Sequence, residues 1–90
     1  MDTLMEADGH VRILVVDDEE IVRDMLFDAL SQTGYTVKTA KDGNDAIAQI
    51  ENEPFEIVIT DLKMPGMSGL ELLQRVQKIN PDICVLIITA

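Results

Sequence analysis

The stretch that decides the fold is VRILVVDD, residues 11–18, in which an apolar run stops at two aspartates. The run is rich in β-branched side chains and is broken only by Arg12, which is typical of a strand buried on both faces of a parallel sheet. Apolar side chains then recur at helical spacing over residues 21–30, with charged side chains on the opposite side. A buried strand that leads directly into an amphipathic helix predicts a repeating strand–helix architecture.

The same alternation continues along the sequence. The predicted elements are strands at residues 11–16, 35–40, 55–61 and 83–88, with helices between them at residues 21–30, 44–53 and 68–79. Asn44 is expected to cap the second helix, and Ser68 forms a capping box with Glu71 at the start of the third. Cys84 is expected to be a buried strand residue. Strands separated by helices of this length predict an α/β protein with a parallel sheet and right-handed crossovers.

The charge of the chain excludes several classes of partner. In 90 residues, seven lysines and arginines face seventeen aspartates and glutamates, which gives a net charge of −10. Such a chain repels nucleic-acid phosphates and anionic membrane surfaces, so we expect direct binding to neither. A divalent cation or a basic partner is a better match for this charge.

Length and cysteine content predict one small cytoplasmic domain. The single cysteine cannot form an internal disulfide, which favours a reducing compartment. Residues 1–10 are polar and lack the features of a signal peptide, and the apolar run at residues 83–88 is too short to span a bilayer. We therefore expect a polar leader over residues 1–10 and the folded domain over residues 11–90.

Carboxylates follow two of the predicted strands. Asp17 and Asp18 end the first strand, and Asp61 ends the third. Ligands of open α/β sheets bind at the carboxyl ends of the strands, and a strand order of 2-1-3-4 would bring these three side chains to one place there. Three carboxylates repel one another unless a cation neutralises them. Mg²⁺ suits this set, because it takes one or two carboxylates and leaves positions for water and phosphate oxygens.

Each acidic group also has a plainer explanation. The acidic residues from Asp18 to Glu20 could cap the first helix and complement its dipole. Asp61 could be an ordinary turn residue. For either acidic group alone, the plainer explanation is preferable to a cation site. The presence of both groups at the ends of neighbouring buried strands favours a cation site.

The motifs that carry these carboxylates resemble those of a known family, the receiver domains of bacterial two-component response regulators. The resemblance covers residues 11–90 and rests on the sequences ILVVDDE at residues 13–19, IVITDLKMPGMSG at residues 57–69 and IITA at residues 87–90. It implies a flavodoxin-like, doubly wound parallel sheet of order 2-1-3-4. The family's fifth strand and last two helices have no counterpart in these 90 residues.

The resemblance also implies roles for individual residues. Asp61 matches the phosphoacceptor, which takes a phosphoryl group from the phosphohistidine of a sensor histidine kinase. The implied Mg²⁺ ligands are Asp18, Asp61, the backbone carbonyl of Lys63, and Asp17 acting through a water. Thr89 matches the switch hydroxyl that bonds the phosphoryl oxygen, and Ala90 matches the small residue beside it.

One departure from the family has physical consequences. The family's fifth strand carries a lysine that pairs with the phosphoryl group, and no residue of this sequence matches it. Without that strand, residues 83–88 form an apolar edge with no charge and no proline, which natural sheets avoid. The sheet face beside the first helix would also be left partly uncovered. We expect either a piece of a longer regulator or a homo-oligomer formed through residues 83–88.

Three alternatives to a phosphoacceptor fit parts of the sequence less well. A Mg²⁺-dependent phosphohydrolase with an aspartyl nucleophile needs Asp-x-Asp after the first strand, where this chain has Asp17, Asp18 and Glu19. Nucleotide-binding enzymes carry a glycine-rich phosphate loop after that strand, which is absent here. A phosphorylation-independent dimerisation or interaction module is favoured by the missing lysine, but the intact aspartates argue against it. The sequence therefore predicts a regulatory phosphoacceptor rather than an enzyme.

Overall fold

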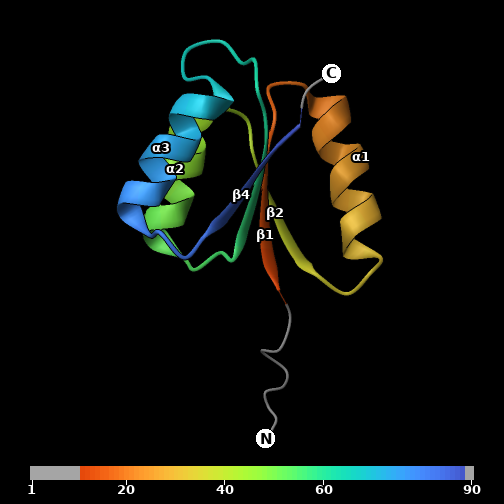
Figure 1. Ribbon diagram of the computed structural model, residues 1–90. Helices are drawn as coiled ribbons and strands as arrows, with labels where there is room; N and C mark the ends of the chain where they lie inside the picture. The colour runs from red at the N-terminus through yellow and green to blue at the C-terminus, as the bar shows by residue number, and fades with distance from the viewer. Residues whose placement is uncertain (1–10, 89–90) are drawn as a thin grey trace, which may run out of the picture.

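The structure is a computed structural model that describes residues 11–88, and these residues form the alternating strands and helices that the sequence predicts (Figure 1). The elements are β1 (Arg12–Val16), α1 (Glu20–Ser31), β2 (Thr36–Ala40), α2 (Gly43–Asn52), β3 (Ile57–Asp61), α3 (Gly69–Ile79) and β4 (Cys84–Ile88). The expectations for residues 1–10, Thr89 and Ala90 lie outside the described residues. Within those described, no helix is long and apolar enough to cross a membrane.

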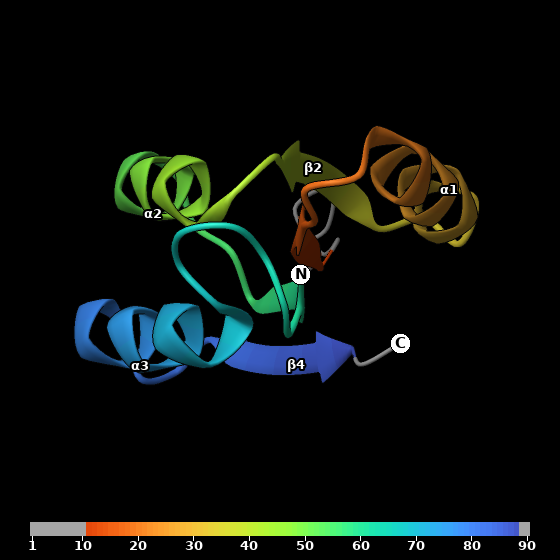
Figure 2. The ribbon, with the colours of Figure 1, turned by 90° about the horizontal axis from the view of Figure 1, so that it is seen from above.

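The sheet has the predicted strand order. Its strands lie in the order β2-β1-β3-β4, and every neighbouring pair is parallel. Helix α1 covers one face, while α2 and α3 lie together on the other (Figure 2). This is the flavodoxin-like, doubly wound arrangement, and it places β2 at an edge as predicted.

The core is divided by the sheet into two layers. β1 contributes to both, since its residues from Ile13 to Val16 are all buried, as predicted for a strand covered on both faces. On the α2–α3 side, Leu14 and Val58 pack with Leu72 and other buried residues in the larger cluster. The smaller cluster, on the α1 side, is built around Ile13, Val15 and Val37. The α2–α3 face is thus the better packed of the two.

The α1 face of the sheet is open beside β4. The side chains of Leu86 and Ile88 are 49% and 45% exposed, and Met25 of α1 is 60% exposed. The prediction that Cys84 is buried is wrong, because its side chain is exposed. Side chains alternate along a strand, and Val85 packs against the α2–α3 cluster. Cys84 therefore points to the α1 side, where no described helix covers β4.

Both later helices begin at a side-chain cap. Ser68 accepts a hydrogen bond from the Glu71 backbone N–H at 3.1 Å, which confirms Ser68 as the cap of α3. The prediction that Asn44 caps α2 is wrong. The cap is Asp42, whose carboxylate accepts from the Asp45 N–H at 2.8 Å. Asp42 has extended backbone angles, and α2 begins directly after it at Gly43.

Candidate metal and phosphoryl site

Three carboxylates meet at the carboxyl ends of β1 and β3. One oxygen from each of Asp17, Asp18 and Asp61 lies within 4.8 Å of the other two. The cause is the register of the parallel strands, which pairs Val16 with Thr60 and so carries the chain into neighbouring aspartates on both strands. The structure therefore brings together the three side chains that the sequence singled out.

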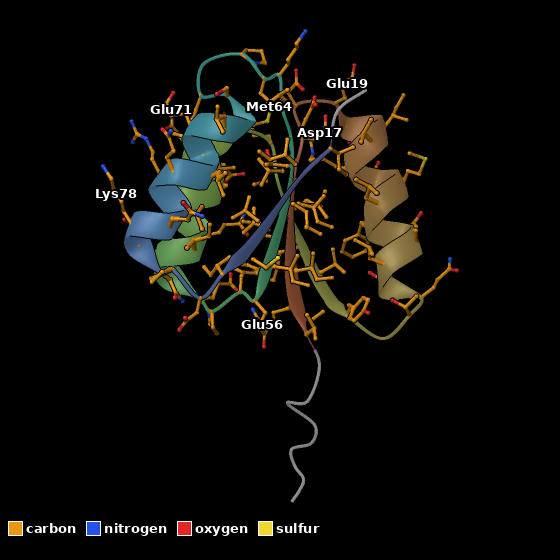
Figure 3. The ribbon with its side chains drawn as sticks, viewed as in Figure 1. Asp17, Glu19, Glu56, Met64, Glu71 and Lys78 are labelled. Carbon is orange, nitrogen blue, oxygen red and sulfur yellow. The ribbon has the colours of Figure 1, made fainter. Side chains whose placement is uncertain are left out.

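The three carboxylates differ in their surroundings. Asp17 is buried, Asp61 is half-buried and Asp18 is exposed. Asp17 is also the most constrained, because its N–H donates to the Ala40 carbonyl at 3.2 Å and its Oδ1 accepts from the Glu19 N–H at 2.9 Å. Figure 3 shows Asp17 and Glu19 at the end of the molecule where β1 meets α1. The backbone thereby holds the Asp17 carboxylate in place beside the other two.

The donor set fits a hard divalent cation. Carboxylate oxygens are the ligands that Mg²⁺ takes in proteins, and clustered carboxylates gain from a cation that removes their repulsion. Asp17, Asp18 and Asp61 could hold the ion from one side, which leaves the solvent side for water and a phosphate oxygen. Lys63 lies two residues beyond Asp61 in the β3–α3 loop with its side chain exposed, and the role of its carbonyl stays a prediction.

Sequence reasoning missed the glycine that supports Asp61. A Cβ built on Gly69, the first residue of α3, would lie 2.2 Å from the Asp61 carbonyl oxygen. The Gly69 N–H also donates to the Leu62 carbonyl at 2.8 Å. The start of α3 therefore packs directly against the backbone of β3 behind the site. Gly69 stands at the end of the PGMSG motif, but the sequence spacing alone does not show that the backbones of α3 and β3 approach each other there.

Two methionines of the β3–α3 loop fill the space beneath the site. Met64 and Met67 are each 9% exposed and belong to the α2–α3 cluster. The Met64 sulfur lies 4.0 Å from the hydroxyl oxygen of Thr60, which is fully buried. Figure 3 shows Met64 pointing inward from this loop. The loop is thus anchored by apolar packing on the side away from the carboxylates.

An apolar cavity adjoins the carboxylates on the α1 side. Its volume is about 220 Å³, and Asp17 and Asp61 lie at its polar end. Its apolar lining comes from α1 and the sheet: Val16, Val22, Met25, Leu26, Ile59 and Ile88. The carboxylates therefore lie beside a largely apolar cavity on the α1 side of the sheet.

Comparison with known proteins places the chain among signalling proteins. The family model described as "Response regulator receiver domain" matches residues 13–90. A probable transcriptional regulatory protein of Mycobacterium tuberculosis, TcrX, is 40% identical over 88 residues, which are 97% of this chain and 38% of that protein. The sensor histidine kinase RcsC of Salmonella typhimurium is 38% identical over 89 residues, 99% of this chain and 9% of the kinase. This chain therefore spans well under half of either relative.

Solved structures give the same result for the fold. The response regulator protein TrrA of Thermotoga maritima, solved in complex with Mg²⁺ and BeF, has a TM-score of 0.85 and 39% identity. The match covers 89% of this chain and 70% of that one. The chemotaxis protein CheY4 of Vibrio cholerae also has a TM-score of 0.85, with 32% identity over 88% of this chain and 68% of its own.

Proposed function

The chain belongs to the response regulator receiver domain family, and from this premise we propose that it is a signalling phosphoacceptor whose Asp61 receives a phosphoryl group with the help of Mg²⁺. The observation that carries the proposal is the convergence of Asp17, Asp18 and Asp61 within 4.8 Å. The relative TrrA, whose fold matches this one, was solved with Mg²⁺ and BeF, which supports the same choice of ion.

In the proposed reaction, the Asp61 carboxylate is the nucleophile. One of its oxygens attacks the phosphorus of a phosphohistidine in line with the phosphorus–nitrogen bond, which breaks as the new oxygen–phosphorus bond forms. The imidazole leaves with the electron pair of that bond, and the product is an aspartyl phosphate. Bound Mg²⁺ would supply charge neutralisation for the phosphoryl oxygens. Asp18, Asp61 and the backbone carbonyl of Lys63 would hold the ion, and Asp17 would act on it through a water.

The proposal assigns the remaining predicted residues to the response. Thr89 directly follows the last described residue of β4, and we propose that its hydroxyl bonds the phosphoryl oxygen once Asp61 is modified. Ala90 leaves room beside that hydroxyl. The proposed donor is a sensor histidine kinase, and the names of the relatives agree with a pathway that contains kinases and transcriptional regulators. The net charge of −10 argues against direct nucleic-acid binding by this chain.

The direct test is the mass of the protein after incubation with a small-molecule phosphodonor. With Mg²⁺ present, we expect one phosphoryl adduct per chain, and with an excess of chelator we expect none, because the uncompensated carboxylates repel the incoming anion. The matched control replaces Mg²⁺ with Ca²⁺, which carries the same charge but is larger and binds oxygens with looser geometry. A chain that takes no phosphoryl group with Mg²⁺ would contradict the proposal and favour the phosphorylation-independent interaction module.

A second proposal concerns the outer edge of β4. The Cys84 N–H donates to the Glu56 carbonyl, and the Ile88 carbonyl accepts from the Leu62 N–H, so these residues face β3. Backbone groups of a strand alternate in direction, and those of Val85 and Ile87 therefore point away from the sheet. No charged side chain interrupts the strand. We propose that a second copy of the chain pairs with this edge and forms a homo-oligomer.

Oligomeric state checks this second proposal. We expect the molar mass from light scattering to rise with protein concentration, and we expect Val85→Pro to remain a monomer. Proline at this position removes an outward N–H and leaves the hydrogen bonds to β3 intact, and its ring keeps an apolar group against the α2–α3 cluster where Val85 packs. Ile21→Ser, on the exposed start of α1, is a control that removes an apolar side chain away from the edge. An unmutated chain that stays monomeric at high concentration would contradict the proposal.

A further inference from the structure

We infer that Arg23 is a positioning residue for the carboxylate cluster, and this inference rests on the Mg²⁺-dependent function proposed above. The Arg23 side chain belongs to α1 but reaches back to the β1–α1 connection. Its Nη1 donates to the Asp17 backbone carbonyl oxygen at 2.7 Å, and the contact is partly buried. Arg23 thus connects the helix to the residue where β1 ends and the acidic site begins.

The acceptor of the Arg23 hydrogen bond is a backbone carbonyl, although several carboxylates lie near Arg23 in the sequence. Arg23 lies among acidic residues, with Glu19 and Glu20 before it and Asp24 after it. Within the described part of the chain, however, its guanidinium makes no ion pair with a carboxylate. It donates instead to a carbonyl, in a hydrogen bond that the positive charge of the donor strengthens.

The carbonyl of Asp17 controls the position of the next aspartate. The peptide unit is planar, so the direction of the Asp17 carbonyl also sets the directions of the Asp18 N–H and Cα. Within the described part of the chain, the Asp18 side chain makes no hydrogen bond, and it is exposed. Its place in the cluster therefore depends on the backbone that carries it. The Arg23 contact fixes that backbone.

Asp17 makes three hydrogen bonds, two with backbone groups of other residues and one with the Arg23 side chain. Its N–H is held by the Ala40 carbonyl and its Oδ1 by the Glu19 N–H. The partner in both hydrogen bonds is a backbone group, so substitution of Ala40 or Glu19 would not remove it. The third contact comes from the Arg23 side chain, so it can be removed while all three carboxylates stay in the sequence.

Electrostatics and positioning predict opposite results for the removal of Arg23. A positive charge near a cation site repels the cation, so a purely electrostatic role predicts tighter Mg²⁺ binding without it. If Arg23 positions Asp17 and Asp18, removal should weaken Mg²⁺ binding instead. Groups that orient metal ligands typically contribute about 10- to 100-fold to metal affinity. The sign of the change therefore separates the two roles.

The experiment compares Mg²⁺ dissociation constants, measured by titration and followed by amide chemical shifts, for the unmutated chain and three variants. We expect Arg23→Met to raise the dissociation constant about tenfold or more. Arg23→Lys keeps a donor and the charge, and it should recover a large part of the affinity. Arg75→Met is the matched control, since Arg75 pairs with Glu71 on exposed α3, across the sheet from α1.

A phosphodonor assay adds a readout that a general loss of stability would not produce. For Arg23→Met, the Mg²⁺ concentration that gives the half-maximal rate should rise, while the rate at saturating Mg²⁺ stays near that of the unmutated chain. Unchanged or tighter Mg²⁺ binding by Arg23→Met would overturn the inference and leave the proposed function standing. If Arg23→Met does not fold, Arg23→Gln takes its place with the same expectation. Mg²⁺ binding by Arg23→Gln as tight as that of Arg75→Met, with unmoved Asp17 and Asp18 amide shifts, would overturn the inference. An unmutated chain that does not bind Mg²⁺ would overturn both.

Discussion

Asp61→Asn is expected to abolish the phosphoryl adduct completely. The amide occupies nearly the same space as the carboxylate, so β3 and the cluster should keep their shape, but the amide oxygen is not a competent nucleophile. The substitution also removes one of the three carboxylates that meet within 4.8 Å, so Mg²⁺ binding should weaken as well. Intact mass after incubation with Mg²⁺ and a phosphodonor measures the adduct directly.

The stability of this variant separates loss of chemistry from loss of fold. Without divalent ions, Asp61→Asn relieves repulsion in the cluster, and its free energy of unfolding should be equal to or above that of the unmutated chain. Asp82→Asn is the matched control. It removes the same charge just before β4, at the amino ends of the strands and away from the carboxylate cluster. An adduct that persists in Asp61→Asn would show that another side chain is phosphorylated, and the assignment of Asp61 would be wrong.

The sequence was sufficient to predict the carboxylate cluster because the cluster follows from strand order and register. The apolar runs defined β1 and β3, and parallel strands share a carboxyl edge, so the aspartates after each run had to meet if the strands were neighbours. The same reasoning predicted that β1 is buried on both faces and β2 lies at an edge. The apolar runs and the aspartates are patterns within single segments, and the strand order that brings them together is the one that the family resemblance implied.

The errors arose where the outcome depends on packing between segments. Burial of Cys84 was predicted from its place in an apolar run, but burial requires a covering element, and β4 is open on the α1 side. Asn44 and Asp42 are both good capping residues. The choice between them depends on where the backbone turns into the helix. Contacts such as that of Arg23 with the Asp17 carbonyl depend on the angle at which α1 leaves the sheet.

Gly69→Ala is expected to damage the site through the backbone of β3. An added Cβ would lie 2.2 Å from the Asp61 carbonyl oxygen and 3.0 Å from the Leu62 Cα. Both are backbone atoms, so no side chain can rotate away, and either α3 or the end of β3 must move. Overpacking of this kind costs about 3 kcal/mol at the upper end of the usual range. In a domain of this size, that loss lowers Tm by roughly 12–24 °C.

The displacement should reach the carboxylate itself, because the carbonyl that the new methyl group meets belongs to Asp61. We therefore expect weaker Mg²⁺ binding and slower phosphoryl uptake even at temperatures where Gly69→Ala is fully folded, measured by titration and intact mass. Gly34→Ala is the control: its φ of +95° makes alanine strained, but no atom lies within 4 Å of the new Cβ. It should lose stability and retain Mg²⁺ affinity. If Gly69→Ala also retained full affinity, the close packing of α3 behind Asp61 would support the fold alone, and the position of the nucleophile would not depend on it.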